Sequence, residues 1–285
     1  ADVTPGGQPP ATAPTSPAFV ATACALMALV SLSIDAILPG LESLAADLGV
    51  ADGNRRQWVI TALFLGLACG QLIYGPMSDS IGRRKAILLG VAVFSAGSLV
   101  SATAQSFEAM LVGRVIQGLG VAGPRTVTVA MIRDRFEGAA MARLMSVIMT
   151  VFIMVPVLAP GLGQLVLLVA GWRVLFLFVM AFAWAAAAAL VLLVPERKIS
   201  RPPFNLRDTW IGAAAILTHR RSMAVTVAGG CIYGALMGYV NSSEQIFHGV
   251  FDTGALYPAY FGGLAVFMAA ATATNGQLLK RVSMQ

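Results

Sequence analysis

The stretch Gly75-Pro76-Met77-Ser78-Asp79-Ser80-Ile81-Gly82-Arg83-Arg84-Lys85 separates two long apolar runs of this sequence. The first run covers residues 58–74, and the second covers residues 86–104. A link that carries an acid and three adjacent bases is too polar to lie in hydrocarbon, so we expect it at a membrane face. Adjacent cations favour the cytoplasmic face by the positive-inside rule. The stretch therefore predicts two spanning helices and sets their direction.

The overall composition agrees with a membrane protein. Of the 285 residues, 58% are hydrophobic and only 11% are charged, whereas soluble domains carry roughly 25% charged residues. The net charge of +6 alone fits nucleic-acid binding, but the bases stand in short links between apolar runs. Membrane topology explains that distribution better, so we expect no nucleic-acid partner.

Apolar runs of membrane-spanning length recur along the chain. A helix needs roughly 20 apolar residues to cross the hydrocarbon core, and several of the links here, such as Ala170-Gly171, are too short to hold a folded domain. The pattern predicts an all-α polytopic membrane protein that lies in the lipid bilayer. The expected helices cover about residues 18–40, 57–77, 86–106, 108–132, 144–168, 172–195, 222–243 and 258–279.

The distribution of bases predicts which links face the cytoplasm. Links on one side hold most of the 19 Lys and Arg residues, which places that side, and the N-terminus, in the cytoplasm. The expected outer links hold only Arg55, Arg56 and Arg173. The expected cytoplasmic bases are Arg83, Arg84, Lys85, Arg133, Arg135, Arg143, Arg197, Lys198, Arg201, Arg207, Arg220, Arg221, Lys280 and Arg281.

The opening stretch resembles the loop 2–3 signature of the major facilitator superfamily, roughly G-x-x-x-D-R-x-G-R-R/K. Ser80 departs from the pattern, which usually has Arg or Lys there. The resemblance implies the major facilitator fold and a gate at the cytoplasmic side. The matching residues are Gly75, Asp79, Gly82, Arg83 and Arg84.

This resemblance implies a division of the chain into bundles. Residues 1–17, rich in Pro and Thr and free of bases, are expected as a disordered cytoplasmic tail. Residues 18–195 form a complete amino-terminal six-helix bundle, and residues 196–221 form the basic cytoplasmic linker. Residues 222–285 supply the first two helices of an incomplete carboxy-terminal bundle. The sequence stops where a ninth helix is expected, so we expect truncation after the eighth helix.

Asp35 and Arg114 are candidate proton-coupling residues. A carboxylate within a membrane helix is energetically costly and usually faces a polar interior. The alternative for Asp35 is an acid near a helix end that reaches the outer interface. Arg114 and Gln117 share one helix face with Arg125 and Thr128. At 1.5 Å per residue, Asp35 and Arg114 both lie roughly 8 Å below the same surface, so the two side chains are placed to meet. The alternative for Arg114 is snorkelling to the interface.

The segment around Arg114 also resembles the helix 4 signature R-x-x-Q-G-x-G of proton-driven facilitators. Arg114, Gln117, Gly118 and Gly120 match it, and the resemblance assigns the arginine to proton coupling. It further implies that Asp134 pairs with the Arg83/Arg84 end of the loop signature and closes the cytoplasmic side. The alternative for Asp134 is an ordinary interface charge.

The helix expected at residues 144–168 resembles the antiporter signature G-P-x-x-G-G. Pro160 and Gly163 match, whereas Ala159 and Gln164 replace glycines of the pattern. The signature is associated with exporters, so the resemblance implies the direction of transport. Proline also lets a spanning helix kink, and small residues let helices approach closely.

Arg125 of the helix expected at residues 108–132 and polar, aromatic and thioether residues of the last two expected helices are candidates for the substrate pathway. A mixed aromatic, thioether and polar lining suits a promiscuous pocket, and ordinary packing between helices is the alternative. The candidates are Arg125, Tyr233, Met237, Asn241, Glu244, Thr272 and Asn275. Cys24, Cys69 and Cys231 are solitary and are interpreted as buried apolar residues, so no metal site is expected.

Among major facilitators, the sequence is most similar to the drug:proton antiporters of the bicyclomycin and chloramphenicol resistance type. This similarity is carried by residues 34–39, by the loop signature and by residues 123–125 and 132–134. It implies a multi-pass protein of the bacterial inner membrane, monomeric when full length, that exports small, mostly apolar drugs in exchange for protons. No cofactor is expected, since the proton gradient drives transport.

Two alternatives to this exporter remain. The first is an importer of the same fold, and the second is a truncated, non-transporting chain that acts with a partner membrane protein. An enzyme is not expected, because the sequence shows no nucleophile–base pairing, phosphate loop or metal-ligand cluster.

Overall fold

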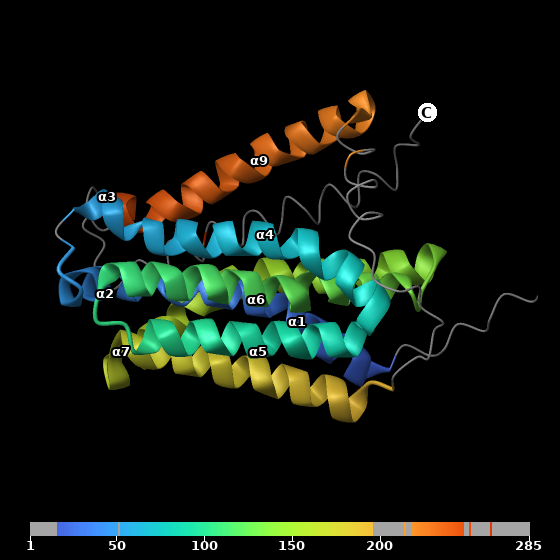
Figure 1. Ribbon diagram of the computed structural model, residues 1–285, viewed down its shortest axis with the longest axis horizontal. Coiled ribbons are helices and arrows are strands. Elements are labelled where there is room, and N and C mark those ends of the chain that lie inside the picture. Colours follow the sequence, from blue (N-terminus) through green and yellow to red (C-terminus); the bar gives the residue numbers. More distant parts are fainter. Residues whose placement is uncertain are drawn as a thin grey trace, which may run out of the picture.

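The computed structural model describes residues 16–50, 52–195, 214, 218–247, 251 and 263. In this part of the chain, long helices pack side by side into a bundle (Figure 1). The elements in chain order are α1 (Pro17–Asp35), the 3₁₀ helix η1 (Leu38–Gly40), α2 (Leu41–Asp47), α3 (Gly53–Arg56), α4 (Trp58–Ile81), α5 (Arg83–Ala102), α6 (Phe107–Arg133), α7 (Gly138–Leu193) and α9 (Arg220–Gln245).

Most of the expected helices are present with small shifts of their ends. The first expected helix ends early, at Asp35, and the chain continues through η1 and α2 because Pro39 cannot supply the N–H that a continuing helix needs. The eighth expected helix, 258–279, lies outside the described residues except for Gly263. The expected tail and most of the expected linker lie outside them too.

The expectation of an eleven-residue link at residues 75–85 is wrong. Helix α4 continues to Ile81 and α5 begins at Arg83, so only Gly82 leaves the helical conformation, at φ 107° and ψ 144°. This conformation favours glycine, which lacks a Cβ. The hydroxyls of Ser78 and Ser80 donate to backbone carbonyls three residues earlier, so these polar residues remain within the helix.

Helix α7 contains two helical segments that meet at Gly171. Gly171 has φ 73° and ψ 174°, which interrupts the helix as the sequence predicts for Ala170-Gly171. This break and the Gly82 break mark opposite ends of the bundle, which are called here the Gly171 end and the Gly82 end. Asp47 and Ala104 lie at the Gly171 end, where Arg173 contacts both, while Asp134 lies at the Gly82 end beside Arg83.

Helix α6 packs closely between α4 and α5 through glycines. A Cβ on Gly118 would overlap the Leu63 carbonyl oxygen of α4, and a Cβ on Gly120 would overlap the Phe94 backbone nitrogen of α5. Small residues allow such approaches between helices in membranes. Both glycines belong to the helix 4 signature, so part of that signature serves packing.

The outer surface of the bundle is apolar. Leu72, Leu168 and Val169 are 74%, 73% and 88% exposed, which fits lipid contact rather than water contact. Cys69 and Cys231 are also exposed, so the expectation that they are buried is wrong; an apolar residue need not be buried where the solvent is lipid. Five helical segments of the described residues are long and apolar enough to cross a membrane, namely Pro17–Asp47, Gly53–Ile81, Arg83–Ala102, Phe107–Arg133 and Leu158–Leu193.

Candidate functional site

Asp35 is a buried acid at the last position of α1. Its side chain is only 3% exposed, and its Oδ2 accepts a hydrogen bond of 2.7 Å from the hydroxyl of Ser31, one turn earlier. The helix ends here, so Asp35 lies beside backbone carbonyls that have no partner within α1. The structure therefore places an acid in the interior of an apolar bundle.

Arg114 of α6 is also buried, at 1% exposure, and its guanidinium contacts α1 and α4. Its Nη1 and Nη2 both donate to the Ser33 carbonyl at 3.1 Å, and its Nε donates to the Val59 carbonyl at 3.0 Å. Its Nη1 also donates to Gln117 Oε1 at 2.6 Å. Ser33 lies in the last turn of α1, so Arg114 caps the carboxyl end of that helix.

The structure brings Asp35 and Arg114 to the same depth but forms no ion pair between these two described residues. Arg114 instead binds the backbone of α1 two residues before Asp35. The sequence places charges along each helix but does not reveal which carbonyls a helix end leaves free. Here the guanidinium satisfies those carbonyls, and its link to Asp35 is indirect, through the end of α1.

Ser98 of α5 is a site residue that the sequence analysis missed. Its Oγ accepts a hydrogen bond of 2.8 Å from Gln117 Nε2, while Gln117 Oε1 accepts from Arg114. Ser98 is fully buried, so Gln117 connects Arg114 to a third helix. The available signal is the spacing of Ser95, Ser98 and Ser101, which lie on one face of α5.

A second group of charges lies at the Gly82 end and is called here the Gly82 cluster: Asp79, Arg83 and Asp134. Arg83 Nε donates to Asp134 Oδ2 at 2.8 Å, and Arg83 Nη1 lies 2.5 Å from Asp79 Oδ1. Arg83 Nη1 also donates to Ser78 Oγ at 2.6 Å. The predicted contact between Asp134 and the signature therefore forms, and it joins the end of α4 to the end of α6.

Arg84 does not share this contact. Its Nη2 donates to the Val191 carbonyl near the end of α7, because successive residues of a helix point in different directions. The expected pairing of Asp134 with the Arg83/Arg84 end of the signature is therefore made by Arg83, while Arg84 bonds α7. Gly82 supplies the backbone break, while a Cβ on Gly75 would meet open space.

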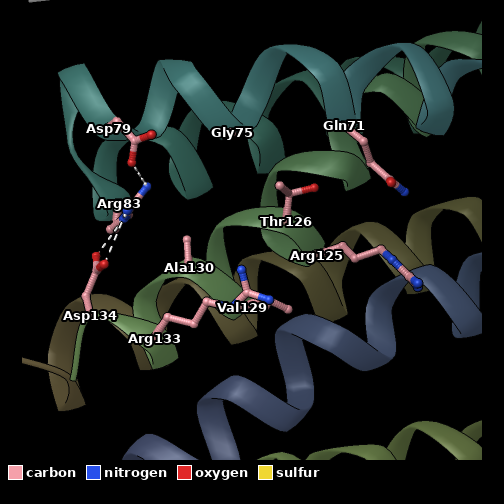
Figure 2. Close-up of a pocket in the computed structure, with 10 residues that line it drawn as sticks. All are labelled: Gln71, Gly75, Asp79, Arg83, Arg125, Thr126, Val129, Ala130, Arg133 and Asp134. Carbon is pink, nitrogen blue, oxygen red and sulfur yellow. Dashed lines mark hydrogen bonds and ion pairs between the residues drawn. The ribbon is translucent and has the colours of Figure 1, made fainter. Parts of the chain in front are cut away.

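A cavity of about 450 Å³ lies between α4 and α6, beside the Gly82 cluster (Figure 2). Its walls carry residues from both helices, and Arg125 lies at the end away from the cluster. Arg125 is a half-buried lining residue of this cavity, and its role in a substrate pathway stays a prediction. The lining residues are Gln71, Gly75, Asp79, Arg83, Arg125, Thr126, Val129, Ala130, Arg133 and Asp134.

Pro160 and Gly163 lie in the first segment of α7 and are buried. A Cβ on Gly163 would overlap the carbonyl oxygen of Ala36, the residue after Asp35. Gly163, one of the two matched residues of the antiporter signature, therefore lets α7 pack against the chain next to the buried acid. This contact ties the position of α7 to the end of α1.

The remaining pathway candidates are not placed. Tyr233, Met237, Asn241 and Glu244 belong to α9, but their side chains lie outside the described part of the structure. Thr272 and Asn275 lie outside the described residues altogether. Figure 1 shows α9 at the edge of the view, tilted relative to the bundle.

Comparison with curated proteins finds relatives named for drug resistance. The chain is 28% identical to the bicyclomycin resistance protein homolog of Haemophilus influenzae, covering 85% of this chain and 61% of the relative. It is 26% identical to multidrug resistance protein D of Escherichia coli, covering 84% and 63%. It is 30% identical to multidrug resistance protein MdtL of Citrobacter koseri, covering 73% and 56%. The chain thus spans about 60% of the length of these relatives.

Comparison with solved structures agrees on the fold. The human organic anion transporter MFSD10 (TETRAN) superposes with a TM-score of 0.65 at 20% identity, covering 90% of this chain and 71% of that one. Residues 23–285 match the Major Facilitator Superfamily. The length and apolar surface of the helices indicate a multi-pass membrane protein. The chain therefore belongs to the Major Facilitator Superfamily of membrane transporters.

Proposed function

We propose that this protein is a secondary transporter that exports small, mostly apolar drugs across the bacterial inner membrane in exchange for protons. The drug-resistance names of its relatives support the substrate class. The observation that carries the proposal is the buried acid Asp35 at the end of α1, which Arg114 caps from α6. An ionisable residue inside a membrane bundle is a functional site by default.

Asp35 carries the proton in this mechanism. The Ser31 hydroxyl donates to Asp35 Oδ2, a bond that favours the ionised carboxylate and weakens when the carboxyl gains a proton. The end of α1 then readjusts, and Arg114 passes the change to α6 because it is bonded to the Ser33 carbonyl. Gln117 and Ser98 hold the guanidinium in the direction that this transfer requires.

The Gly82 cluster acts as the gate on the cytoplasmic side. Arg83 holds Asp79 of its neighbouring helix α4 and Asp134 at the end of α6. The abundance of bases at this end supports its assignment to the cytoplasm, with the N-terminus on the same side. Movement of α6 driven from Asp35 opens or closes these contacts, as one bundle rocks against the other. The protein works as a monomer.

Replacement of Asp35 by Asn tests the proposal. The variant loses proton-driven accumulation of a fluorescent, mostly apolar dye in everted membrane vesicles, yet binds the dye as the wild type does. Glu42→Gln is the matched control, because Glu42 is an exposed acid on the nearby helix α2. Uphill transport by Asp35→Asn at the wild-type rate would sink the proposal. Dye movement in the opposite direction would identify an importer.

A further inference from the structure

Arg125 differs from the other arginines of the bundle interior in its partners. It lies about eight residues before the end of α6, or roughly 12 Å from the Gly82 end. Its guanidinium lies over the Phe152 ring of α7, with Cζ 5.2 Å from the ring centroid. Its Nη1 is buried, and no residue within the described part of the chain forms a hydrogen bond with it. Arg125 therefore carries a positive charge that these residues do not neutralise.

The Nη1 of Arg125, which has no hydrogen-bond partner among the described residues, contrasts with the hydrogen-bonded guanidinium groups of two other arginines. Arg114 is satisfied by backbone carbonyls and Gln117, and Arg83 binds two carboxylates. A buried donor without a partner costs about 1–3 kcal/mol, and more when it is charged. A cation at this depth in a membrane bundle is expected to face an anion or a water-filled space. Arg125 is one of the residues that line the cavity between α4 and α6 (Figure 2).

The cavity has a net positive wall. Its lining holds three arginines, Arg83, Arg125 and Arg133, and two acids. The two acids, Asp79 and Asp134, both bind Arg83, so the wall carries one positive charge in excess. Gln71 and Thr126 add hydrogen-bonding groups, while Val129 and Ala130 add apolar surface. The volume of about 450 Å³ falls within the usual range of small-molecule pockets, roughly 300–1,000 Å³.

We propose that this cavity is an anion-binding site in which Arg125 binds a carboxylate or phosphate oxygen. A guanidinium forms two parallel hydrogen bonds to such groups, and the Phe152 ring fixes one face of it. The apolar part of the ligand lies along Val129 and Ala130. The bound group belongs either to an organic acid that the protein carries, which rests on the proposed function, or to an anionic lipid.

Binding of benzoate to the purified protein in phosphatidylcholine nanodiscs tests the site, with neutral benzamide as the matched probe. In calorimetric titrations, Arg125→Gln weakens benzoate binding at least tenfold, or about 1.4 kcal/mol, and leaves benzamide binding unchanged. Arg125→Lys retains the positive charge, so its benzoate affinity lies between those of the wild type and Arg125→Gln. Arg143→Gln is the control, because Arg143 is an exposed cation of α7 outside the cavity. Benzoate binding at full affinity to Arg125→Gln overturns the proposal.

A measurement on the wild type avoids any effect of substitution on folding. Phenylglyoxal modifies accessible arginines, and peptide mass spectrometry follows each one. Arg125 reacts in anion-free protein and is protected several-fold by saturating benzoate, whereas Arg143 reacts equally in both cases. An Arg125 that does not react without added anion shows that another part of the protein fills the cavity, which overturns the proposal.

A lipid arm identifies the source of the anion. The titration is repeated in nanodiscs that contain phosphatidylglycerol. The site binds a lipid phosphate if benzoate binding is lost there and if the purified protein retains phosphatidylglycerol only when Arg125 is present. Unchanged benzoate binding assigns it to an organic acid. If neither benzoate nor phosphatidylglycerol responds to Arg125→Gln, the proposal fails. Because these assays need no transport, their outcome is independent of the Asp35 test.

Discussion

Ser98 connects Gln117 to α5, and its loss has a specific expected effect. Ser98→Ala leaves the buried Gln117 Nε2 without its acceptor, which costs about 1–3 kcal/mol. We expect a lower melting temperature and a lower ratio of dye moved to protons consumed, with dye binding intact. Differential scanning fluorimetry and vesicle transport measure the two effects.

Ser95→Ala is the control for Ser98, because the Ser95 hydroxyl bonds only the Val91 carbonyl of its own helix in the described structure. We expect that substitution to leave coupling unchanged. If both serine substitutions reduce coupling equally, the effect is one of general packing, and Ser98 has no positioning role toward Arg114.

Arg83 and Arg84 are adjacent in sequence but serve different contacts, so they should differ on substitution. Arg83→Gln removes the cation that joins Asp79 to Asp134, and opening of the Gly82 end exposes the cavity. We expect several-fold faster maleimide labelling of a cysteine placed at Val129, a half-buried residue of the cavity wall, in a background in which the native cysteines are replaced by alanine. Arg84→Gln should not change that rate, since Arg84 bonds the Val191 carbonyl. An equal increase of the labelling rate in Arg83→Gln and Arg84→Gln would contradict a gate centred on Arg83.

At the scale of the helices, close approach between α4 and α6 depends on Gly118. In Gly118→Ala, the added Cβ overlaps the Leu63 carbonyl oxygen and forces the helices apart, at a cost of about 1–3 kcal/mol. We expect a markedly lower melting temperature and less folded protein after detergent extraction. Gly161→Ala is the control, because a Cβ there meets open space. A Gly118→Ala protein as stable as the wild type would show that the helices separate without cost.

The breaks between helices show what a local pattern predicts. Gly171 ends a helical segment as expected, because the left-handed conformation there favours a residue without a Cβ. At Gly82 the sequence predicts a break but overestimates its length, since polar residues such as Ser78 and Asp79 read as a loop. Tertiary contacts decide that point: Arg83 binds both side chains, so these residues remain helical at the membrane face.

At the scale of the whole molecule, the two ends of the bundle should face opposite sides of the membrane. Asn54 lies at the Gly171 end and Glu137 at the Gly82 end, and both are exposed. With the native cysteines replaced by alanine, an impermeant maleimide applied to intact spheroplasts should label Asn54→Cys and spare Glu137→Cys. Permeabilised cells should show labelling of both. The opposite pattern would reverse the orientation and move the Gly82 cluster to the outer side.

The amino-acid sequence is sufficient to predict that the chain crosses a membrane repeatedly, where most helices lie, and that Asp35 and Arg114 lie at similar levels of their helices. These properties follow from apolar length and from the fixed rise of a helix. Only the tertiary structure decided that Arg114 caps α1, that Arg83 rather than Arg84 binds Asp134, and that Arg125 lines a cavity. Those outcomes depend on how far each helix rotates and how closely its neighbours approach. Glycine contacts between helices set both the rotation of each helix and its distance from its neighbours. The residue pattern along a single helix does not contain this information.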